Sequence, residues 1–229
     1  MCGISAAIGV ITPQVENQVR SNLLQLKHRG PDDDGYVTGE GYALGHNRLA
    51  ILGGKEISGQ PFTYLGNWLA YNGEVHNYIA LGEELSKLGH SIPPGSDVPV
   101  VAAALTEWGA AAPQRFDGFF AFVFVNPSRK EAIIGRDQLG QKPLHYYTEA
   151  TAIGKRYMIA SEAKALVKIK SPNNEVALLS ALQATYPTAP ASCYAQVRQF
   201  VPGDVYTVGL STGHHFVKAK PKRKHKSFA

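Results

Sequence analysis

Apolar residues in this chain follow two patterns: short continuous runs, and segments in which they recur every three or four positions. Residues 3–11 form an apolar run that predicts a buried strand directly after Cys2. Residues 14–27 follow with helical spacing and predict an amphipathic helix. Residues 28–35 are rich in Gly, Pro and Asp and predict a loop.

The rest of the chain repeats these patterns. Further strands are predicted at 42–51, 67–72, 119–125, 131–136, 143–148, 156–161 and 204–209. Helices are predicted at 78–89, 97–109, 162–169 and, as a short stretch, 175–184. In the second of these helices, Asp97 suits the N-cap position and Pro99 suits the first turn. Many strands with helices grouped around them indicate a layered α+β domain in which sheet packs on sheet.

Length and composition narrow the class of protein. A chain of 229 residues can form one large domain or two small ones, and 44% hydrophobic with 18% charged residues is typical of a globular protein. Two cysteines, Cys2 and Cys193, provide no disulfide framework, which favours a reducing cytoplasm. No apolar run is long enough for a transmembrane helix, and the N-terminus lacks the pattern of a secretory signal.

The net charge of +5 originates in the C-terminal end of the chain. Six Lys and Arg residues fall within 218–226, so the remainder is close to neutral and does not resemble a nucleic-acid-binding surface. We expect residues 1–210 to form one domain, with 171–204 as a proline-punctuated connecting segment. Residues 211–229 are expected to be a basic, disordered tail, which could contact an acidic surface or nucleic acid or could serve only as a solvated end.

The first chemical feature is Cys2. If the initiator Met1 is removed, the thiol nucleophile and a free α-amine that can act as base belong to the same residue. A free thiol titrates near ~8.5 and an α-amine near ~7.7–8.0, so the amine can take up and return a proton at neutral pH. The alternative is an incidental or buried cysteine next to the start codon.

Three further positions suit a pocket for a free amino acid that carries a side-chain acyl group. Asn72 and Gly73 offer an amide and a backbone N–H for an oxyanion, although Asn-Gly also suits an ordinary turn. Arg48 could bind a carboxylate through its fork, or form a surface ion pair. Asp97 could bind an ammonium group, cap a helix, or do both. Glutamine is the candidate ligand.

An ordered series of motifs supports this interpretation. The series is Met1-Cys2-Gly3-Ile4, Arg29-Gly30-Pro31-Asp32-Asp33, Gly45-His46-Asn47-Arg48-Leu49-Ala50-Ile51, Tyr71-Asn72-Gly73-Glu74, Gly95-Ser96-Asp97, Phe116-Asp117-Gly118-Phe119-Phe120-Ala121-Phe122, Arg136-Asp137-Gln138-Leu139-Gly140-Gln141-Lys142-Pro143-Leu144 and Ala160-Ser161-Glu162-Ala163-Lys164-Ala165-Leu166. Over about residues 2–210 it resembles the glutaminase domain of class II glutamine amidotransferases, in particular the glutamine-hydrolysing asparagine synthetase branch.

The resemblance implies a four-layer α/β/β/α N-terminal-nucleophile fold. It implies that Cys2 attacks the carboxamide of L-glutamine and forms a γ-glutamyl thioester, with Asn72 and Gly73 as the oxyanion hole. By the same resemblance Arg48 binds the substrate carboxylate, Asp97 with Glu74 binds the α-ammonium, and the backbone around Leu49 and Ile51 lines the pocket. Neither a metal nor another cofactor is expected.

The sequence leaves three hypotheses for the role of the chain. It ends where the family's ATP-dependent domain would begin, so we expect a glutaminase that supplies ammonia to a separate synthetase subunit. A second hypothesis is a non-catalytic glutamine-binding or regulatory module, which a retained Met1 would favour. The third is a truncated asparagine synthetase that lacks its ATP-dependent domain.

Overall fold

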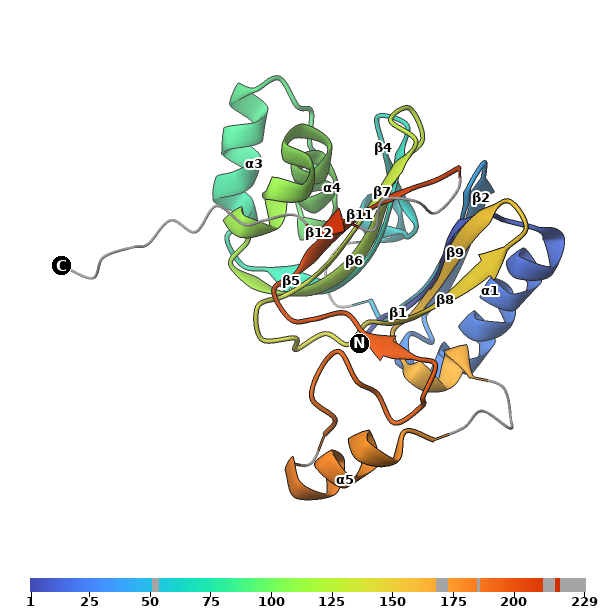
Figure 1. Ribbon diagram of the computed structural model, residues 1–229. Coiled ribbons are helices and arrows are strands. Elements are labelled where there is room, and N and C mark those ends of the chain that lie inside the picture. The colour runs from blue at the N-terminus through green and yellow to red at the C-terminus, as the bar shows by residue number, and fades with distance from the viewer. Residues whose placement is uncertain (51–53, 168–172, 185, 212–216, 219–229) are drawn as a thin grey trace.

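The computed structural model describes residues 1–50, 54–167, 173–184, 186–211 and 217–218. Within them the strands form two antiparallel sheets that face each other (Figure 1). The first sheet has the order β10 (Arg198–Gln199), β8 (His145–Thr151), β9 (Gly154–Ala160), β1 (Gly3–Gly9), β3 (Tyr42–Arg48) and β2 (Asp33–Gly39). The second has the order β12 (Val217–Lys218), β11 (Val205–Gly209), β7 (Glu131–Arg136), β6 (Gly118–Asn126), β5 (Asn67–Val75) and β4 (Phe62–Tyr64).

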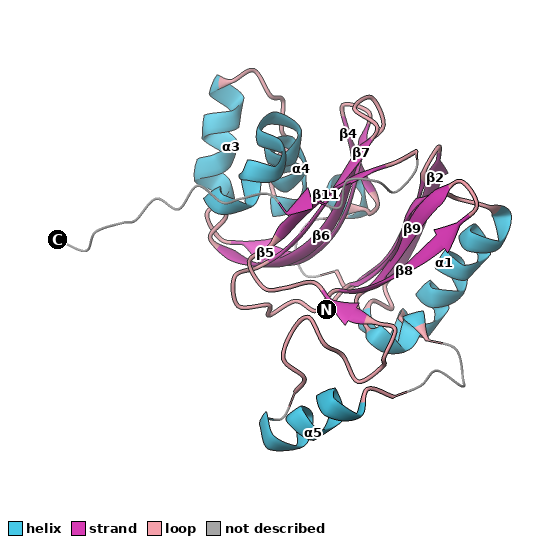
Figure 2. Ribbon diagram, viewed as in Figure 1, coloured by secondary structure: helices cyan, strands magenta, loops and turns pink. Residues whose placement is uncertain are grey.

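Helices cover the outer face of each sheet (Figure 2). The longer helices are α1 (Pro13–Gln25), α3 (Tyr78–Lys87), α4 (Asp97–Trp108) and α5 (Glu175–Ala184). The shorter ones are α2 (Lys55–Ser58) and the 3₁₀ helices η1 (Lys27–Arg29), η2 (Gly109–Arg115) and η3 (Ala163–Leu166). Because α1 packs on the first sheet and α4 on the second, with α3 against α4, the layers run α/β/β/α. The predicted four-layer α+β fold is confirmed.

Three apolar layers hold the four structural layers together. On β6, Phe120, Phe122 and Phe124 pack toward α3 and α4, whereas Val123 and Val125 pack between the two sheets. Alternating side chains point to opposite faces of a strand, so a strand covered on both faces must be apolar throughout. This explains the continuous apolar run that the sequence shows at 119–125.

The predicted elements agree with the structure best where a strand is buried on both faces. The loop predicted at 28–35 is wrong in part, because Asp33 and Asp34 begin the edge strand β2, which pairs with β3. Edge strands are half exposed and tolerate polar residues, so their apolar pattern is weak. The helix predicted at 162–169 is the short η3, followed by residues 168–172, which lie outside the described residues. Strand β4 and helix α2 were not predicted.

The C-terminal part of the chain contains the expected short helix, α5. Val176, Leu179 and Leu182 on this helix are exposed. Most of the predicted basic tail, residues 212–216 and 219–229, lies outside the described residues, and the domain boundary at residue 210 stays a prediction. Among the described helices, none has the length and apolar character that crossing a membrane requires.

Candidate active site

Cys2 lies immediately before β1, at one end of the space between the two sheets. Strand β1 is in the middle of the first sheet, paired with β3 on one side and β9 on the other. The backbone N–H of Leu49, just after β3, lies 3.5 Å from Cys2 Sγ and donates to it, and Leu49 O lies 3.9 Å from the same sulfur. A half-buried thiol is therefore held at the edge of a rigid sheet.

Asn72 and Gly73 reach the same place from the second sheet. They lie inside β5, opposite Ala121 and Phe120 of β6, so the alternative of an Asn-Gly turn is wrong. The backbone N–H of Cys2 donates to Asn72 Oδ1 at 3.0 Å. Asn72 is only 2% exposed, and among the described residues its Nδ2 has no hydrogen-bond partner. A buried amide donor without a partner is costly unless a ligand fills it.

Close packing explains why position 73 is a glycine. A Cβ added to Gly73 would lie 2.3 Å from the carbonyl oxygen of Phe119, on the neighbouring strand β6. Any side chain there would push β5 and β6 apart, because a backbone atom cannot move aside as a flexible side chain can. The glycine thus allows β5 to pair closely with β6 beside Asn72.

Arg48, the last residue of β3, lies on the first-sheet side of the pocket. It is buried, and its Nη2 donates to Ser58 Oγ at 2.7 Å. Ser58 Oγ in turn donates to Gly54 O, which fixes the end of α2 beneath the guanidinium. The surface ion pair considered for Arg48 is wrong, since the side chain is enclosed.

Asp97 lies across from Arg48, on the second-sheet side. It is the first residue of α4, and the N-cap is Ser96, whose Oγ accepts from Val98 N at 3.2 Å; the N-cap assignment of Asp97 is therefore wrong by one residue. Pro99 does lie in the first turn. Asp97 Oδ2 accepts from Tyr71 OH at 2.7 Å and Val75 N at 3.0 Å. Burial raises the pKa of Asp97 above its ordinary value, against the lowering effect of these bonds.

One pocket connects these groups, with an empty volume of about 590 Å³ that includes space open to solvent. The structure brings together seven of the eight predicted site residues: Cys2, Arg48, Leu49, Asn72, Gly73, Glu74 and Asp97. The eighth, Ile51, lies outside the described residues. The roles assigned to these residues stay predictions.

The pocket has further lining residues that sequence reasoning did not assign: Met1, Ser58, Gln60, Tyr71, Ser96, Val98 and Lys142. Gln60 Oε1 accepts from Tyr71 N at 2.6 Å and so supports β5 next to Asn72. Lys142 belongs to one of the quoted motifs, and its Nζ lies 4.5 Å from the centre of the Phe119 ring. Ser58 and Gln60 come from a segment without any regular pattern, so no sequence signal pointed to them.

The electrostatics of the thiol call for a base. Burial raises the pKa of Cys2 above its ordinary value, only partly offset by the Leu49 N–H and by nearby positive charges. The thiol is therefore protonated at neutral pH, and it would need a proton acceptor to act as a nucleophile. His46 lies buried in the same layer with Nε2 3.0 Å from Tyr71 O, and burial lowers its pKa to about 4. This makes His46 a neutral structural residue.

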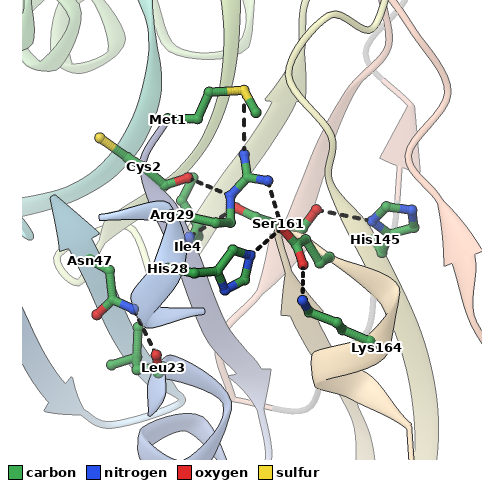
Figure 3. Close-up of polar contacts among 11 residues, drawn as sticks. Met1, Cys2, Ile4, Leu23, His28, Arg29, Asn47, His145, Ser161 and Lys164 are labelled. Carbon is green, nitrogen blue, oxygen red and sulfur yellow. Dashed lines mark hydrogen bonds and ion pairs between the residues drawn. The ribbon is translucent and has the colours of Figure 1, made fainter. Parts of the chain in front are cut away.

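A second buried arginine, Arg29, lies next to the carbonyl group of Cys2, and the Cys2 thiol points away from it (Figure 3). Its Nε donates to Cys2 O at 2.9 Å and its Nη1 to Glu162 Oε1 at 2.8 Å. Arg29 and Glu162 both belong to the series of motifs, but no role was predicted for either residue. Within the described chain, no group of three or more His, Cys, Asp or Glu residues is arranged to hold a metal ion.

Comparisons with known proteins show the family to which the chain belongs. Residues 1–216 match the family described as glutamine amidotransferase domain. The chain is similar to asparagine synthetase [glutamine-hydrolyzing] 1 of Bacillus subtilis, with 32% identity over 91% of this chain and 33% of the relative. It is also similar to asparagine synthetase B of Escherichia coli, with 35% identity over 74% of this chain and 30% of the relative. The chain thus spans about a third of the length of these relatives.

A solved structure shares the fold. The glutamine phosphoribosylpyrophosphate amidotransferase from B. subtilis superposes with a TM-score of 0.66 at 20% identity, covering 96% of this chain and 49% of the other. A second solved structure, described as the allosteric regulatory enzyme of purine biosynthesis, gives a TM-score of 0.63 at 20% identity. At this identity the likeness concerns the fold alone.

Proposed function

Because the chain belongs to the glutamine amidotransferase domain family, we propose that it hydrolyses L-glutamine to glutamate and ammonia through a γ-glutamyl thioester on Cys2. The observation that carries this proposal is the contact between Cys2 N and Asn72 Oδ1 at 3.0 Å, together with the buried, unpartnered Asn72 Nδ2 among the described residues. One amide side chain thereby orients the nucleophilic residue and keeps a donor available for the substrate oxygen.

Removal of Met1 starts the chemistry. It converts the Cys2 backbone N–H into a free α-amine, already within hydrogen-bond distance of Asn72 Oδ1. It also removes a side chain that lines the pocket. Since burial raises the pKa of the thiol, this amine supplies the base that the thiol lacks.

The first half-reaction forms the thioester. Cys2 Sγ attacks the carboxamide carbon of glutamine while the α-amine takes the thiol proton. The negative charge that develops on the carbonyl oxygen is stabilised by Asn72 Nδ2 and by the backbone N–H of Gly73. The amine returns the proton to the leaving nitrogen, the C–N bond breaks, and ammonia departs with its electron pair.

The second half-reaction regenerates the thiol. The α-amine takes a proton from water, and the resulting hydroxide attacks the thioester carbon within the same oxyanion hole. The C–S bond breaks, the thiolate regains the proton, and glutamate leaves. The reaction consumes glutamine and water and produces glutamate and ammonia, with no oxidant, reductant or metal.

The two charged sides of the pocket select the amino-acid part of the substrate. Arg48 binds the α-carboxylate through its guanidinium, and Asp97 with Glu74 binds the α-ammonium. The side-chain carboxamide then points at Cys2 and Asn72. The backbone around Leu49 lines the path between them.

We further propose that the ammonia passes to an amidating partner of the asparagine-synthetase type. Ammonia released into neutral water is mostly protonated, and ammonium is a poor nucleophile, so direct transfer is chemically favoured. The support comes from the relatives, which are glutamine-hydrolysing asparagine synthetases about three times as long as the matched region. Formation of asparagine from glutamine and aspartate, only when such a partner and ATP are added, would support this step.

The experiment that tests the hydrolysis is glutamate release from glutamine by the untagged chain, after mass spectrometry has established that Met1 is absent. We expect steady production of equal amounts of glutamate and ammonia. Absence of turnover by chains with Cys2 at the N-terminus would contradict the proposal. It would favour the alternative of a glutamine-binding module, which calorimetric titration with glutamine would then detect.

The position of Met1 supports the alternative of a glutamine-binding module. Met1 lines the pocket, so a chain that retains it has an amide where the proposal requires an amine. A retained Met1 in the purified chain, combined with binding but no hydrolysis of glutamine, would identify a non-catalytic module.

A further inference from the structure

Two side chains hold the backbone of Cys2: Asn72 contacts its N–H, and Arg29 contacts its carbonyl oxygen. The side chain of Arg29 is 6% exposed, and its Nε donates to the carbonyl oxygen of Cys2 at 2.9 Å. Its Nη2 lies 3.7 Å from Met1 Sδ. The guanidinium plane therefore fixes the backbone of Cys2, and with it the directions of the thiol and of the future α-amine (Figure 3).

Arg29 itself is held by one carboxylate. Its Nη1 donates to Glu162 Oε1 at 2.8 Å. A buried guanidinium that loses its carboxylate keeps its charge and must move or draw in water, so the partner decides where the fork points. Because the fork is rigid, displacing the Nη1 end also displaces the Nε end that binds Cys2.

Glu162 contacts two further side chains. His28 Nε2 lies 3.0 Å from its Oε1, and Lys164 Nζ lies 2.9 Å from its Oε2. Burial alone would raise the pKa of Glu162, but the contacts with Arg29, Lys164 and His28 lower it to about 2. The carboxylate is therefore ionised at any pH at which the protein would work.

The backbone places Glu162 at a fixed position relative to Cys2. The residue before it, Ser161, exchanges two hydrogen bonds with Ile4: Ile4 N donates to Ser161 Oγ at 2.9 Å, and Ser161 N donates to Ile4 O at 2.9 Å. His145 Nδ1 contacts Ser161 O at 3.2 Å. Thus the segment that carries Glu162 is attached to the strand that begins directly after the nucleophile.

The short helix η1, which carries Arg29, has equally little freedom. A Cβ added to Gly30, which follows η1, would lie 2.4 Å from the backbone carbonyl of Asn47 on β3, so the end of η1 lies directly against that strand. Asn47 Nδ2 also donates to Leu23 O at 2.6 Å, which attaches the end of α1 to β3 (Figure 3). The part of this arrangement that can still change position is the Arg29 side chain, and its contact with Glu162 fixes that position.

We propose that Glu162 is a positioning residue for the nucleophile, acting through the Arg29 guanidinium on the backbone carbonyl of Cys2. The inference rests on the proposed glutaminase function and deepens it. Glu162 does not line the substrate pocket, and Arg48 and Asp97 do. Loss of the Glu162 charge should therefore impair attack by Cys2 and leave glutamine binding almost intact.

The test is the Glu162→Gln variant of the untagged chain, with removal of Met1 verified by mass spectrometry. Glutamine has nearly the same shape, so the change removes charge and little volume. We expect kcat for glutamine hydrolysis to fall by about tenfold to about a hundredfold, the range for small misplacements of reacting groups, while KM stays within about threefold. Glu162→Asp, which keeps the charge and draws it back, should give an intermediate kcat.

A second measurement does not depend on turnover. The rate at which iodoacetamide alkylates Cys2 reports the position and environment of the thiol and α-amine. We expect this rate, followed against pH by peptide mass spectrometry, to fall about tenfold in Glu162→Gln. Cys193 in the same chain provides the internal reference, and its alkylation rate should not change.

Lys164→Ala is the matched control. Lys164 contacts Glu162 without reaching Arg29 or Cys2, and its side chain is 53% exposed. An exposed ion pair of this kind contributes little, so kcat and alkylation should stay within about twofold of wild type. An effect as large as that of Glu162→Gln would show that general loss of charge, and not the hold on Arg29, is responsible, and would overturn the proposal.

A double-mutant cycle tests whether Glu162 acts through Arg29. If it does, adding Glu162→Gln to Arg29→Lys should reduce kcat and the alkylation rate little further than Arg29→Lys alone. Multiplicative effects would overturn the proposal, as would a wild-type alkylation rate in Glu162→Gln. If the wild-type chain released no glutamate, the proposed function would fail, and the alkylation rates would still decide the role of Glu162.

Discussion

Two acidic residues, Asp97 and Glu162, lie on opposite sides of Cys2, and their contacts differ in charge. Asp97, on the pocket side, accepts hydrogen bonds from the neutral Tyr71 hydroxyl and the Val75 backbone, and among the described residues it forms no ion pair. Glu162, on the side away from the pocket, contacts Arg29, His28 and Lys164. Burial raises the pKa of Asp97, whereas the pKa of Glu162 falls to about 2.

This difference distinguishes a carboxylate that is suited to binding a ligand from one that stabilises the structure. A carboxylate in contact with the cations Arg29 and Lys164 is already neutralised and contributes to holding the chain in place. A buried carboxylate with only neutral donors keeps an unbalanced charge, which is costly in the free protein and is relieved when a cation binds. In the proposed mechanism, Asp97 on the pocket side is available to bind an α-ammonium group, and Glu162 on the opposite side holds Cys2 in position.

The largest effect should follow from removing the Cys2 thiol, which lies between Asp97 on one side and Glu162 on the other. Cys2→Ala should lower glutamate release by at least about a thousandfold, because the nucleophile is lost. The melting temperature should stay near that of the wild type, since Cys2 is only half buried. Turnover and calorimetric binding of glutamine by this variant should separate, with binding kept and hydrolysis lost. Unchanged hydrolysis would contradict the mechanism.

The next effect concerns the pocket side alone. Asp97→Asn keeps the shape and removes the charge, so kcat/KM for glutamine should fall about a hundredfold or more, mainly through KM. Because burial raises the pKa of Asp97, its ionised form is disfavoured in the folded protein, and the variant should unfold at an equal or higher urea concentration than wild type. Glu84→Gln, at an exposed ion pair on α3, is the control and should change neither quantity appreciably. A loss of stability in Asp97→Asn without a change in KM would reverse the roles of the two regions.

A smaller effect should appear as a pH dependence. As pH falls through the raised pKa of Asp97, protonation removes the charge that binds the ammonium group, so KM should increase. Glu162 should stay ionised throughout, because its stabilising contribution, present above its unfolded pKa, is lost only as pH falls through about 2. Steady-state kinetics at mildly acidic pH should therefore show a rise in KM for glutamine that is separate from any change in kcat, because the α-amine base acts on kcat. Asp97→Asn should abolish that rise in KM; its persistence there would assign the titration to another group.

The smallest effect concerns the support of Asp97. Ser96 caps α4 through the bond from Val98 N, so Ser96→Ala should cost about 1 kcal/mol of stability in urea unfolding. Because Asp97 is the next residue, a KM increase of a few-fold should accompany the loss. On the other side of Cys2, Lys164→Ala should cost no more than about 1 kcal/mol and leave KM unchanged. Equal KM effects from both variants would show that the two regions are not separate.

The sequence predicted the pocket side better than the side that holds the nucleophile. Cys2, Arg48, Asn72 and Asp97 are chemically distinctive residues in short motifs, and the structure brings them to one pocket. No role was predicted for Glu162, because its partner Arg29 is 133 positions away and only the folded chain brings the two segments together. Non-local pairing of this kind leaves no pattern in either segment.

The burial of each element also explains which parts of the secondary structure were predicted correctly and which were not. Buried strands such as β6 were predicted because both faces demand apolar residues, as Phe120 to Val125 show. The first three residues of the edge strand β2 were taken as part of a loop, since Asp33, Asp34 and Gly35 satisfy no apolar pattern and owe their extended form to pairing with β3. The N-cap was displaced by one residue because Ser96 and Asp97 both suit a cap, and only the bond to Val98 N distinguishes them.

The most direct test of the central claim is to identify the residue that carries the acyl group during turnover. The processed chain is mixed with glutamine, quenched in acid within the first turnovers, and digested for peptide mass spectrometry. We predict a γ-glutamyl adduct on Cys2, formed and lost at the rate of glutamate release, and none on Cys193. Glutamate release without an adduct on Cys2, or with the adduct on Cys193, would contradict the account.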